Sequence, residues 1–389
     1  MSLTDELKGI IQGEVLSDQK TLETFSKDTS LFQVMPEVVA FPKDAIDIKK
    51  IVSFVSMHKK DRPTLSITGR SAGTCMTGGP LNESIILSFT KHMNASLLDM
   101  VNMKAQVEPG LYYRDFEEKV LPPGIIFPSY PASKSIAALG GIIMNNAGGE
   151  KTLRYGQTRD SVLNVSMVLA DGNEYNFKKI SSDELEKKKV QNDFEGEVYK
   201  KTFDLVEKNF DLIERSKPHV SKNSAGYCLW RVWDRKNFDL SQLFVGSQGT
   251  LGILTKAEIK LVREKPHKKM IAMFLKNWDK LPQIVNTVLP FEPESFEAFD
   301  EATLKLGLRF MPEIARKAHV SFWKFASKFI PEAFIGLRML GIPKLILLAE
   351  FAEDDVSVLQ EKIEKAQVAL KKFKIHIRVL DSQLSLIHI

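Results

Sequence analysis

The feature that most constrains this chain is a set of three glycine-rich segments, each placed beside a strand of an alternating α/β region. Glycine loses more conformational freedom on folding than any other residue, so such segments are costly to order unless the backbone must approach another group closely. The first segment, residues 69–79, follows a strand predicted at Thr64–Thr68. The second covers residues 128–133 and 137–149 and continues through 154–160, and the third covers residues 246–253.

The first segment has the composition of an anion-binding loop. It is neither the GxGxxG dinucleotide pattern nor a Walker loop, because no GK[ST] sequence is present. Its small residues let successive backbone N–H groups approach an anion closely. Ser71, Thr74 and Thr77 add hydroxyl donors. Taken alone, the same loop also fits a tight surface turn.

The other two segments suit a flat ligand. Gly140 and Gly141 beside an apolar run indicate backbone that packs against a planar group, and Asn145 and Asn146 offer amide donors and acceptors. Glycines recur through residues 246–253, between apolar strands. Three such loops in one α/β region favour a large bound cofactor over chance.

The chain divides into three parts by pattern. Residues 1–35 are predicted to be a helical lead-in, and residues 36–263 an α/β domain in which Phe244-Val245 is one of the strands and 181–200 a charged surface excursion. Residues 264–389 follow the order β-α-β, an insert, then β-α-β, which is typical of a ferredoxin-like domain.

The insert, residues 301–344, is aromatic, apolar and basic. We interpret it as helices that pack over the second sheet. The alternatives are a lid on the substrate pocket or a contact with a membrane surface. Pro331 and Pro343 divide the insert, so it is not one long amphipathic helix.

Composition excludes several classes of protein. With 43% hydrophobic and 26% charged residues the chain is an ordinary globular protein, and its net charge of +5 without a concentrated basic face argues against nucleic-acid binding. The two cysteines are too few for a disulfide framework. No secretory signal and no apolar run of transmembrane length is found. We therefore expect a cytoplasmic protein, with membrane association left open through residues 301–344.

The three glycine-rich segments, in this order and at this spacing, resemble the FAD-binding domain of the vanillyl-alcohol-oxidase and p-cresol-methylhydroxylase (PCMH) family. The branch of D-lactate dehydrogenases and glycolate oxidase flavoprotein subunits is the most similar. The resemblance covers residues 36–263 strongly and the rest more loosely. It implies an α+β protein, in which a PCMH-type FAD-binding domain of two subdomains is followed by a ferredoxin-like cap domain with a helical insert.

The resemblance also implies which residues bind FAD. Those of the first segment would wrap the pyrophosphate, those of the second would line the flavin and ribityl chain, and those of the third would contact the cofactor through backbone: Gly69, Arg70, Ser71, Ala72, Gly73, Thr74, Thr77; Pro131, Ser133, Gly140, Gly141, Asn145, Ala147, Gly148; Gly252 and Ile253. Relatives with covalent flavin carry His where this chain has Thr74, so FAD is expected to bind without a covalent link. Many relatives have Glu where this chain has Gln248. Glutamine keeps a hydrogen-bond acceptor and loses the charge, so we interpret the change as tolerated.

The implied reaction is oxidation of a D-2-hydroxy acid of the lactate, glycolate or 2-hydroxyglutarate class, with hydride passing to flavin N5 and then to an unidentified electron acceptor. Two alternatives stay open. One is a flavoenzyme of the alkyl-glycerone-phosphate synthase type, which uses flavin without net redox. The other is a flavin-binding electron-transfer subunit without an active site of its own.

The catalytic base is not evident in the sequence. The seven histidines are scattered, and no metal site is predicted. In the resembling branch the catalytic and metal-binding histidines lie beyond the second β-α-β unit, so we expect a C-terminally truncated and inactive chain, with a divalent metal possible in the full-length protein. Residues 384–389 show no turn or capping pattern and are expected not to be native. Tyr227, in a Lys-Asn-Ser-Ala-Gly-Tyr segment that resembles one near the flavin, is a weak catalytic candidate, and a packed aromatic is the other interpretation.

Overall fold

The computed structural model describes residues 2–317 and 342–381. It divides into two compact units, Met1–Arg263 and Glu264–Ile389, and each is described here by itself. No helix within the described ranges is long and apolar enough to cross a membrane.

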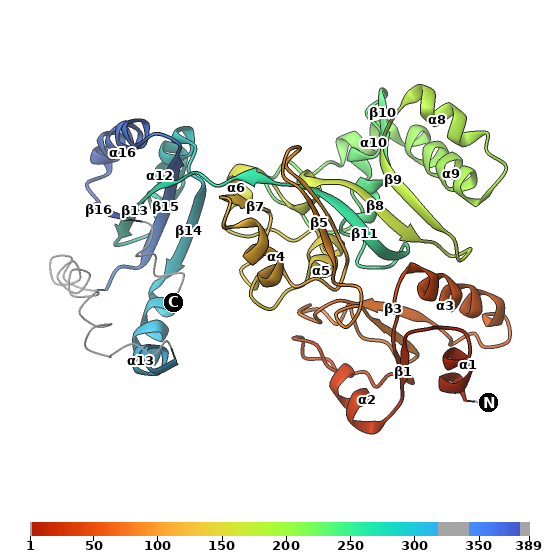
Figure 1. The fold of residues 1–389 in the computed structure, drawn as a ribbon. Coiled ribbons are helices and arrows are strands. Elements are labelled where there is room, and N and C mark those ends of the chain that lie inside the picture. Colours follow the sequence, from red (N-terminus) through yellow and green to blue (C-terminus); the bar gives the residue numbers. More distant parts are fainter. Residues whose placement is uncertain (1, 318–341, 382–389) are drawn as a thin grey trace. The chain divides into compact units, whose positions relative to one another are not determined.

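The first sheet of the N-terminal unit has the strand order β1-β2-β4-β3, in which β1 is antiparallel and the others are parallel. Its strands and the helices around it are β1 (Glu14–Leu16), β2 (Val38–Phe41), β3 (Ile67–Arg70), β4 (Ile85–Ser88), α1 (Leu3–Lys8), α2 (Gln19–Phe25) and α3 (Ala45–His58). Alternate residues of β2 face opposite sides: Val38 and Ala40 join the core under α3, whereas Val39 and Phe41 pack beneath α2. Figure 1 shows α2 and α3 on either side of this sheet. Asp44 caps α3 as predicted, by accepting hydrogen bonds from two backbone N–H groups of its first turn.

The first 35 residues differ from the helical lead-in predicted for them. They contain the helices α1 and α2, but β1 lies between these and pairs with β2 at the edge of the first sheet. Leu7 and Val15 are buried in the same core as β2. A strand of only three residues is too short to show an alternating pattern, and its partner lies more than twenty positions away, so the sequence carries no local signal for it.

The second sheet of this unit is antiparallel, in the order β10-β9-β8-β11-β6-β5. Its strands are β5 (Ser96–Asp99), β6 (Lys104–Val107), β8 (Val162–Val168), β9 (Glu174–Ser181), β10 (Asn237–Asp239) and β11 (Ile253–Lys260). The hairpin predicted at Asp171-Gly172 joins β8 to β9, with Gly172 at φ +79°. A small pair, β7 (Ile125–Ile126) and β12 (Val262–Arg263), completes the strands of the unit.

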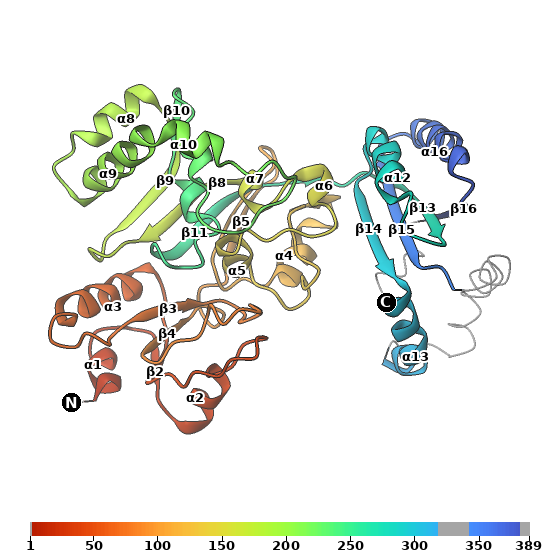
Figure 2. The same cartoon turned by 180° about the vertical axis from the view of Figure 1, so that it is seen from behind.

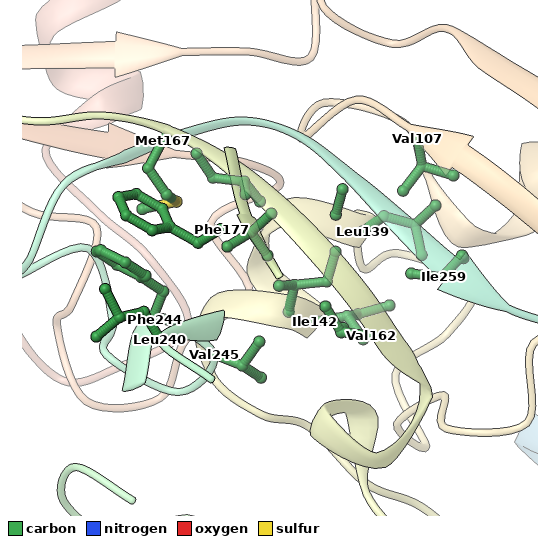
Figure 3. Packing of buried hydrophobic residues seen from close by; sticks show 14 of the residues in the cluster. Val107, Leu139, Ile142, Val162, Met167, Phe177, Leu240, Phe244, Val245 and Ile259 are labelled. Atoms are coloured by element: carbon green, nitrogen blue, oxygen red, sulfur yellow. The ribbon is translucent and has the colours of Figure 1, made fainter. Parts of the chain in front are cut away.

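Helices cover the second sheet and supply its core. They are α4 (Tyr113–Val120), α5 (Leu139–Met144), α6 (Thr152–Tyr155), α7 (Thr158–Ser161), α8 (Ser182–Lys189), α9 (Phe194–Lys208), α10 (Phe210–Arg215) and α11 (Ser241–Phe244), with a 3-10 turn at Leu229–Arg231. Figure 2 shows α8 and α9 beside β9 and β10, and α4 and α5 below the sheet. In the close view of Figure 3, Leu139 and Ile142 of α5 lie among strand residues such as Val162. Helix α5 is therefore fixed by apolar packing, which matters below because its glycines line a cavity.

Two further predictions for this unit are wrong. Phe244-Val245 is not a strand, because Phe244 is the last residue of α11. The ring centres of Phe244 and Phe177 lie 4.6 Å apart, so a short helix buries this apolar pair as a strand would. The charged stretch 181–200 is not a simple surface excursion, because it forms α8 and the first half of α9 and buries Leu185 and Tyr199.

The C-terminal unit has the predicted ferredoxin-like order. Its elements are β13 (His267–Leu275), α12 (Leu281–Val288), β14 (Ser295–Asp300), α13 (Glu301–Lys317), β15 (Leu345–Glu353), α16 (Val356–Leu370) and β16 (His376–Asp381), with 3-10 turns at Leu289–Phe291 and Lys371–Phe373. The antiparallel sheet runs β14-β15-β13-β16. Its core packs α12 and α16 on one face through residues such as Ile284, Leu359 and Ile363. The split β-α-β pattern is thus confirmed.

Only the beginning of the predicted insert is described, as α13. Residues 318–341 lie outside the described part of the chain, so the packed helices, the lid and the membrane contact considered for residues 301–344 all stay predictions.

Candidate functional site

The three glycine-rich segments meet at one cavity in the N-terminal unit. The first leaves β3, the second contains α5, and the third enters β11. The cavity holds about 660 Å³ of space, counting the part that is open to solvent. Its lining residues are Gly69, Ser71, Ala72, Gly73, Thr74, Cys75, Gly79, Pro80, Phe89, Pro109, Gly140, Gly141, Met144, Asn145, Gln248, Gly249, Gly252, Ile253 and Leu254.

Backbone hydrogen bonds hold the segments together. The carbonyl oxygen of Pro109 accepts from the hydroxyl of Ser71 at 2.9 Å and from the N–H of Gly140 at 3.0 Å, which joins the first segment to the second. The N–H of Gln248 donates to the carbonyl of Met144 at 2.8 Å, which joins the third segment to the second. The cavity walls are therefore connected to one another through α5.

The first segment presents unused hydrogen-bond donors. Among the described residues, no acceptor receives a hydrogen bond from the backbone N–H groups between Ser71 and Gly79, although much of this loop is half-buried. Half-buried backbone N–H groups normally find a partner. Successive N–H groups of this kind form a concave site for an anion, as in other phosphate-binding loops.

The second segment leaves room for a ligand at Gly141. A Cβ atom added there would meet one atom within 4 Å, the Cβ of Ser71 at 3.7 Å, so a longer side chain would extend into the cavity. At Gly140 the added Cβ would lie 2.5 Å from a Pro109 atom, so this glycine is required by packing. The amide of Asn145 lines the cavity and makes no hydrogen bond to another described side chain or backbone group, which leaves it available to a ligand.

Acid–base groups are almost absent from this cavity. Of the described residues that line it, Cys75 alone carries an ionisable side chain, and its sulfur lies 3.0 Å from the hydroxyl of Thr77. The cavity therefore has the chemistry of a cofactor-binding site, with backbone donors, small residues and amides, rather than that of a site that moves protons.

Most of the predicted cofactor residues line the cavity, and six do not. Those that line it are Gly69, Ser71, Ala72, Gly73, Thr74, Gly140, Gly141, Asn145, Gly252 and Ile253. Those outside it are Arg70, Thr77, Pro131, Ser133, Ala147 and Gly148. The backbone of the last two serves the fold: the carbonyl of Ala147 accepts from the N–H and hydroxyl of Thr158, and Gly148 packs against Thr152.

Several lining residues were missed. Phe89 follows the end of β4, Pro109 lies in the turn after β6, and Leu254 lies in β11. The sequence gives no local signal that these residues line the cavity. Cys75, Gly79 and Pro80 continue the first segment, and Gln248 and Gly249 belong to the third, so the segments themselves were the signal that could have found them.

Tyr227 lies beside the third segment rather than in the cavity. Its hydroxyl pairs with that of Thr250 at 2.7 Å, and the residue is 45% exposed, so it is not a packed core aromatic. The segment before it is held by Gln157, whose side chain accepts from the N–H of Asn223 at 2.9 Å and donates to the hydroxyl of Ser224 at 2.6 Å. A catalytic role for Tyr227 stays a prediction.

Arg159 is a buried arginine beside Gly246, the first residue of the third segment. Arg159 donates to the carbonyl of Val245 at 2.9 Å, and its Nε has no partner among the described groups. Burial, with repulsion from Arg231, lowers the pKa of Arg159 to about 10, so it stays charged at neutral pH.

No three His, Cys, Asp or Glu side chains of the described ranges come together as metal ligands.

Comparison with known proteins agrees with this cavity. The family described as an FAD binding domain matches residues 36–178, which include the whole of the first two segments. This part of the chain belongs to the FAD binding domain family.

The relatives of this chain are named as oxidases or dehydrogenases. It is 31% identical over 281 residues to the glycolate oxidase subunit GlcD of Bacillus subtilis, covering 71% of this chain and 48% of that protein. It is 26% identical over 343 residues to the D-2-hydroxyglutarate dehydrogenase of Escherichia coli, covering 87% and 32%. It is 27% identical over 310 residues to the D-lactate dehydrogenase of Archaeoglobus fulgidus, covering 79% and 57%. The chain is thus similar to FAD-dependent oxidoreductases, and it spans between about a third and somewhat over half of these relatives.

Solved structures show the same fold. Alkyldihydroxyacetonephosphate synthase superposes with a TM-score of 0.67 at 14% identity, covering 98% of this chain and 62% of that one. p-Cresol methylhydroxylase with substrate bound superposes with a TM-score of 0.63 at 16% identity, covering 98% and 65%. The predicted PCMH-type fold is confirmed, and at these identities the likeness concerns the fold alone.

Proposed function

We propose that this chain binds FAD without a covalent link in the cavity of its N-terminal unit, and that the protein oxidises a D-2-hydroxy acid. The observation that carries the first part is the meeting of three glycine-rich segments around half-buried, unpaired N–H groups. The names of the relatives support the second part, since they act on D-2-hydroxyglutarate, D-lactate or glycolate.

Different residues of the cavity would contact different parts of FAD. The N–H groups of Ser71–Gly79 would donate to the diphosphate, because charge-assisted hydrogen bonds from backbone donors suit phosphate oxygens. Gly141 would let the flexible part of the cofactor pass close to α5. Asn145 and Gln248 would offer amide hydrogen bonds that fix its orientation. Thr74 lacks a nucleophile of the kind that tethers flavin, so no bond to the protein is expected.

When bound, FAD would supply an acceptor for hydride at its N5 atom, and the protein would orient the substrate and exclude competing reactions. The described cavity supplies the binding part of this task. It contains no described carboxylate or imidazole that could accept the substrate's hydroxyl proton. We therefore propose that the proton acceptor, the electron acceptor and any divalent metal lie outside this cavity.

Anaerobic mixing of substrate with protein made from the whole reading frame tests the proposed reaction. D-2-hydroxyglutarate, D-lactate or glycolate should bleach the visible absorption of the flavin, and the L-enantiomers of the chiral acids should not. An enzyme of the alkyl-glycerone-phosphate synthase type would show no bleaching by any hydroxy acid. A flavin subunit without an active site would also stay oxidised with every acid of the panel, and either result would contradict the proposed substrate class.

A further inference from the structure

Arg70, the last residue of β3, carries a buried charge without an ion pair in the described structure. The residue is 9% exposed. Its Nη1 donates to the carbonyl of Phe25 at 3.2 Å, its Nη2 donates to the carbonyl of Lys27 at 2.7 Å, and the guanidinium lies 5.1 Å from the centre of the Phe25 ring. Burial lowers the pKa of Arg70, and Asp28 offsets only part of this effect. A buried cation whose hydrogen-bond partners are neutral is costly unless another anion compensates it.

The guanidinium lies against the anion-binding loop. A Cβ atom added to Gly73 would be 2.5 Å from Nη2 and 2.9 Å from Nε of Arg70. Gly73 lines the cavity and Arg70 does not, so the charge lies behind the loop. Gly73 also has φ +69°, a conformation that residues with side chains rarely adopt. The loop is thus shaped to bring its backbone between the cavity and a positive charge.

The segment Phe25–Thr29, here called the strap, holds both ends of this arrangement. Its carbonyls at Phe25 and Lys27 bind Arg70, and the hydroxyl of Thr29 donates to the carbonyl of Cys75 at 2.8 Å. The strap lies outside residues 36–178, the part that matches the FAD binding domain family. Residues of the N-terminal region are therefore built into the cofactor site.

We propose that Arg70 supplies, from behind Gly73, the positive charge that stabilises the diphosphate of the bound dinucleotide, and that the strap holds Arg70 in that position. The proposal rests on the proposed binding of FAD. Guanidinium is always charged in proteins, and a charge near a half-buried anion is screened less than one at the surface. Arg70 is a positioning residue, because it touches the loop and not the cavity. The charge of Arg70 acts on the phosphate groups of the ligand. Replacing Arg70 should therefore weaken ligands that carry phosphate more than ligands that do not.

Binding titrations of the apoprotein with three probes test this directly. FAD contains both a flavin and a diphosphate. ADP carries a diphosphate without flavin, and riboflavin carries flavin without phosphate. Arg70→Met should weaken FAD and ADP by about tenfold or more, the size of effect expected when one member of a buried charge pair is removed. It should leave riboflavin within about twofold. Arg70→Lys should keep more ADP affinity than Arg70→Met. The control Arg62→Met removes an arginine that is paired with Glu6 elsewhere in the unit, and should change none of the three.

A second variant covers the case in which Arg70→Met does not fold. Thr29→Val removes the strap's bond to Cys75 without a change in charge, and should weaken ADP by a few-fold while riboflavin stays unchanged. Equal losses for ADP and riboflavin in either variant would show that Arg70 and the strap only shape the loop, and would overturn the proposal. So would an Arg70→Met protein with unaltered FAD and ADP affinity, which would leave FAD binding itself standing. Wild-type protein that binds neither FAD nor ADP would overturn the proposed function and this proposal with it.

Discussion

Gly141→Asp should abolish the retention of FAD and leave the fold of the N-terminal unit intact. The added Cβ has space, since its nearest contact is 3.7 Å away, but the carboxylate would extend into the cavity and repel the phosphates. A loss of more than about 100-fold in affinity, or about 2.7 kcal/mol, is expected. Gly141 lies in the first turn of α5, where an acidic residue is favourable to the helix, so the apoprotein should melt within a few degrees of the parent.

Three variants frame this prediction. Gly9→Asp makes the same change at an exposed glycine that has a negative φ and lies outside the cavity, and it should retain FAD fully. Gly141→Ala should lose less than Gly141→Asp, because a methyl group alone fits the space. Gly140→Asp should instead lower thermal stability, since its Cβ would collide with Pro109. FAD binding by Gly141→Asp that equals the parent's would mean that the second segment does not face the cofactor.

Residues 1–389 with FAD bound should be reduced by 2-hydroxy acids at least about 10²- to 10⁴-fold more slowly than an enzyme whose cavity holds a proton acceptor, because that is the usual contribution of such a group. The described lining of the cavity offers one ionisable group, Cys75, and no carboxylate or imidazole. The measurement is anaerobic stopped-flow absorbance with D-lactate, glycolate and D-2-hydroxyglutarate, with and without added zinc or manganese.

Dithionite is the control for that experiment, since it should reduce the bound flavin at once and show that the cofactor is accessible to electrons. Rapid reduction by any hydroxy acid would place the catalytic groups within residues 1–389. Tyr227 would then be the first residue to replace, by Phe, because its hydroxyl lies beside the third segment.

The cavity was largely predictable because its signal is local. Glycines and small residues in residues 69–79, 137–149 and 246–253 mark backbone that must approach a ligand, and the structure brings all three segments to one place. Phe89 and Pro109 were not predictable, because the pairing of distant strands decides where they lie. The same holds for β1, which is short and takes its place from β2, more than twenty positions further along the chain.

Arg70 shows a finer limit of such reasoning. It was predicted to bind the cofactor with its neighbours, yet Gly69 and Ser71 line the cavity and Arg70 does not. Successive residues of a strand face opposite sides, so an arginine between two cavity-lining positions must point away from the cavity. The alternation of β3 at Arg70 was the missed signal, and its target, the strap, is distant in sequence.

The most direct test of this account is the flavin content of the purified protein before and after acid precipitation. The protein should be yellow, or become yellow on addition of FAD, with one FAD bound per chain, and acid should release all of that FAD into the supernatant. Flavin that stays with the precipitate would contradict the non-covalent binding argued from Thr74. A colourless protein that cannot be reconstituted with FAD would contradict the central claim that the three glycine-rich segments form a flavin site.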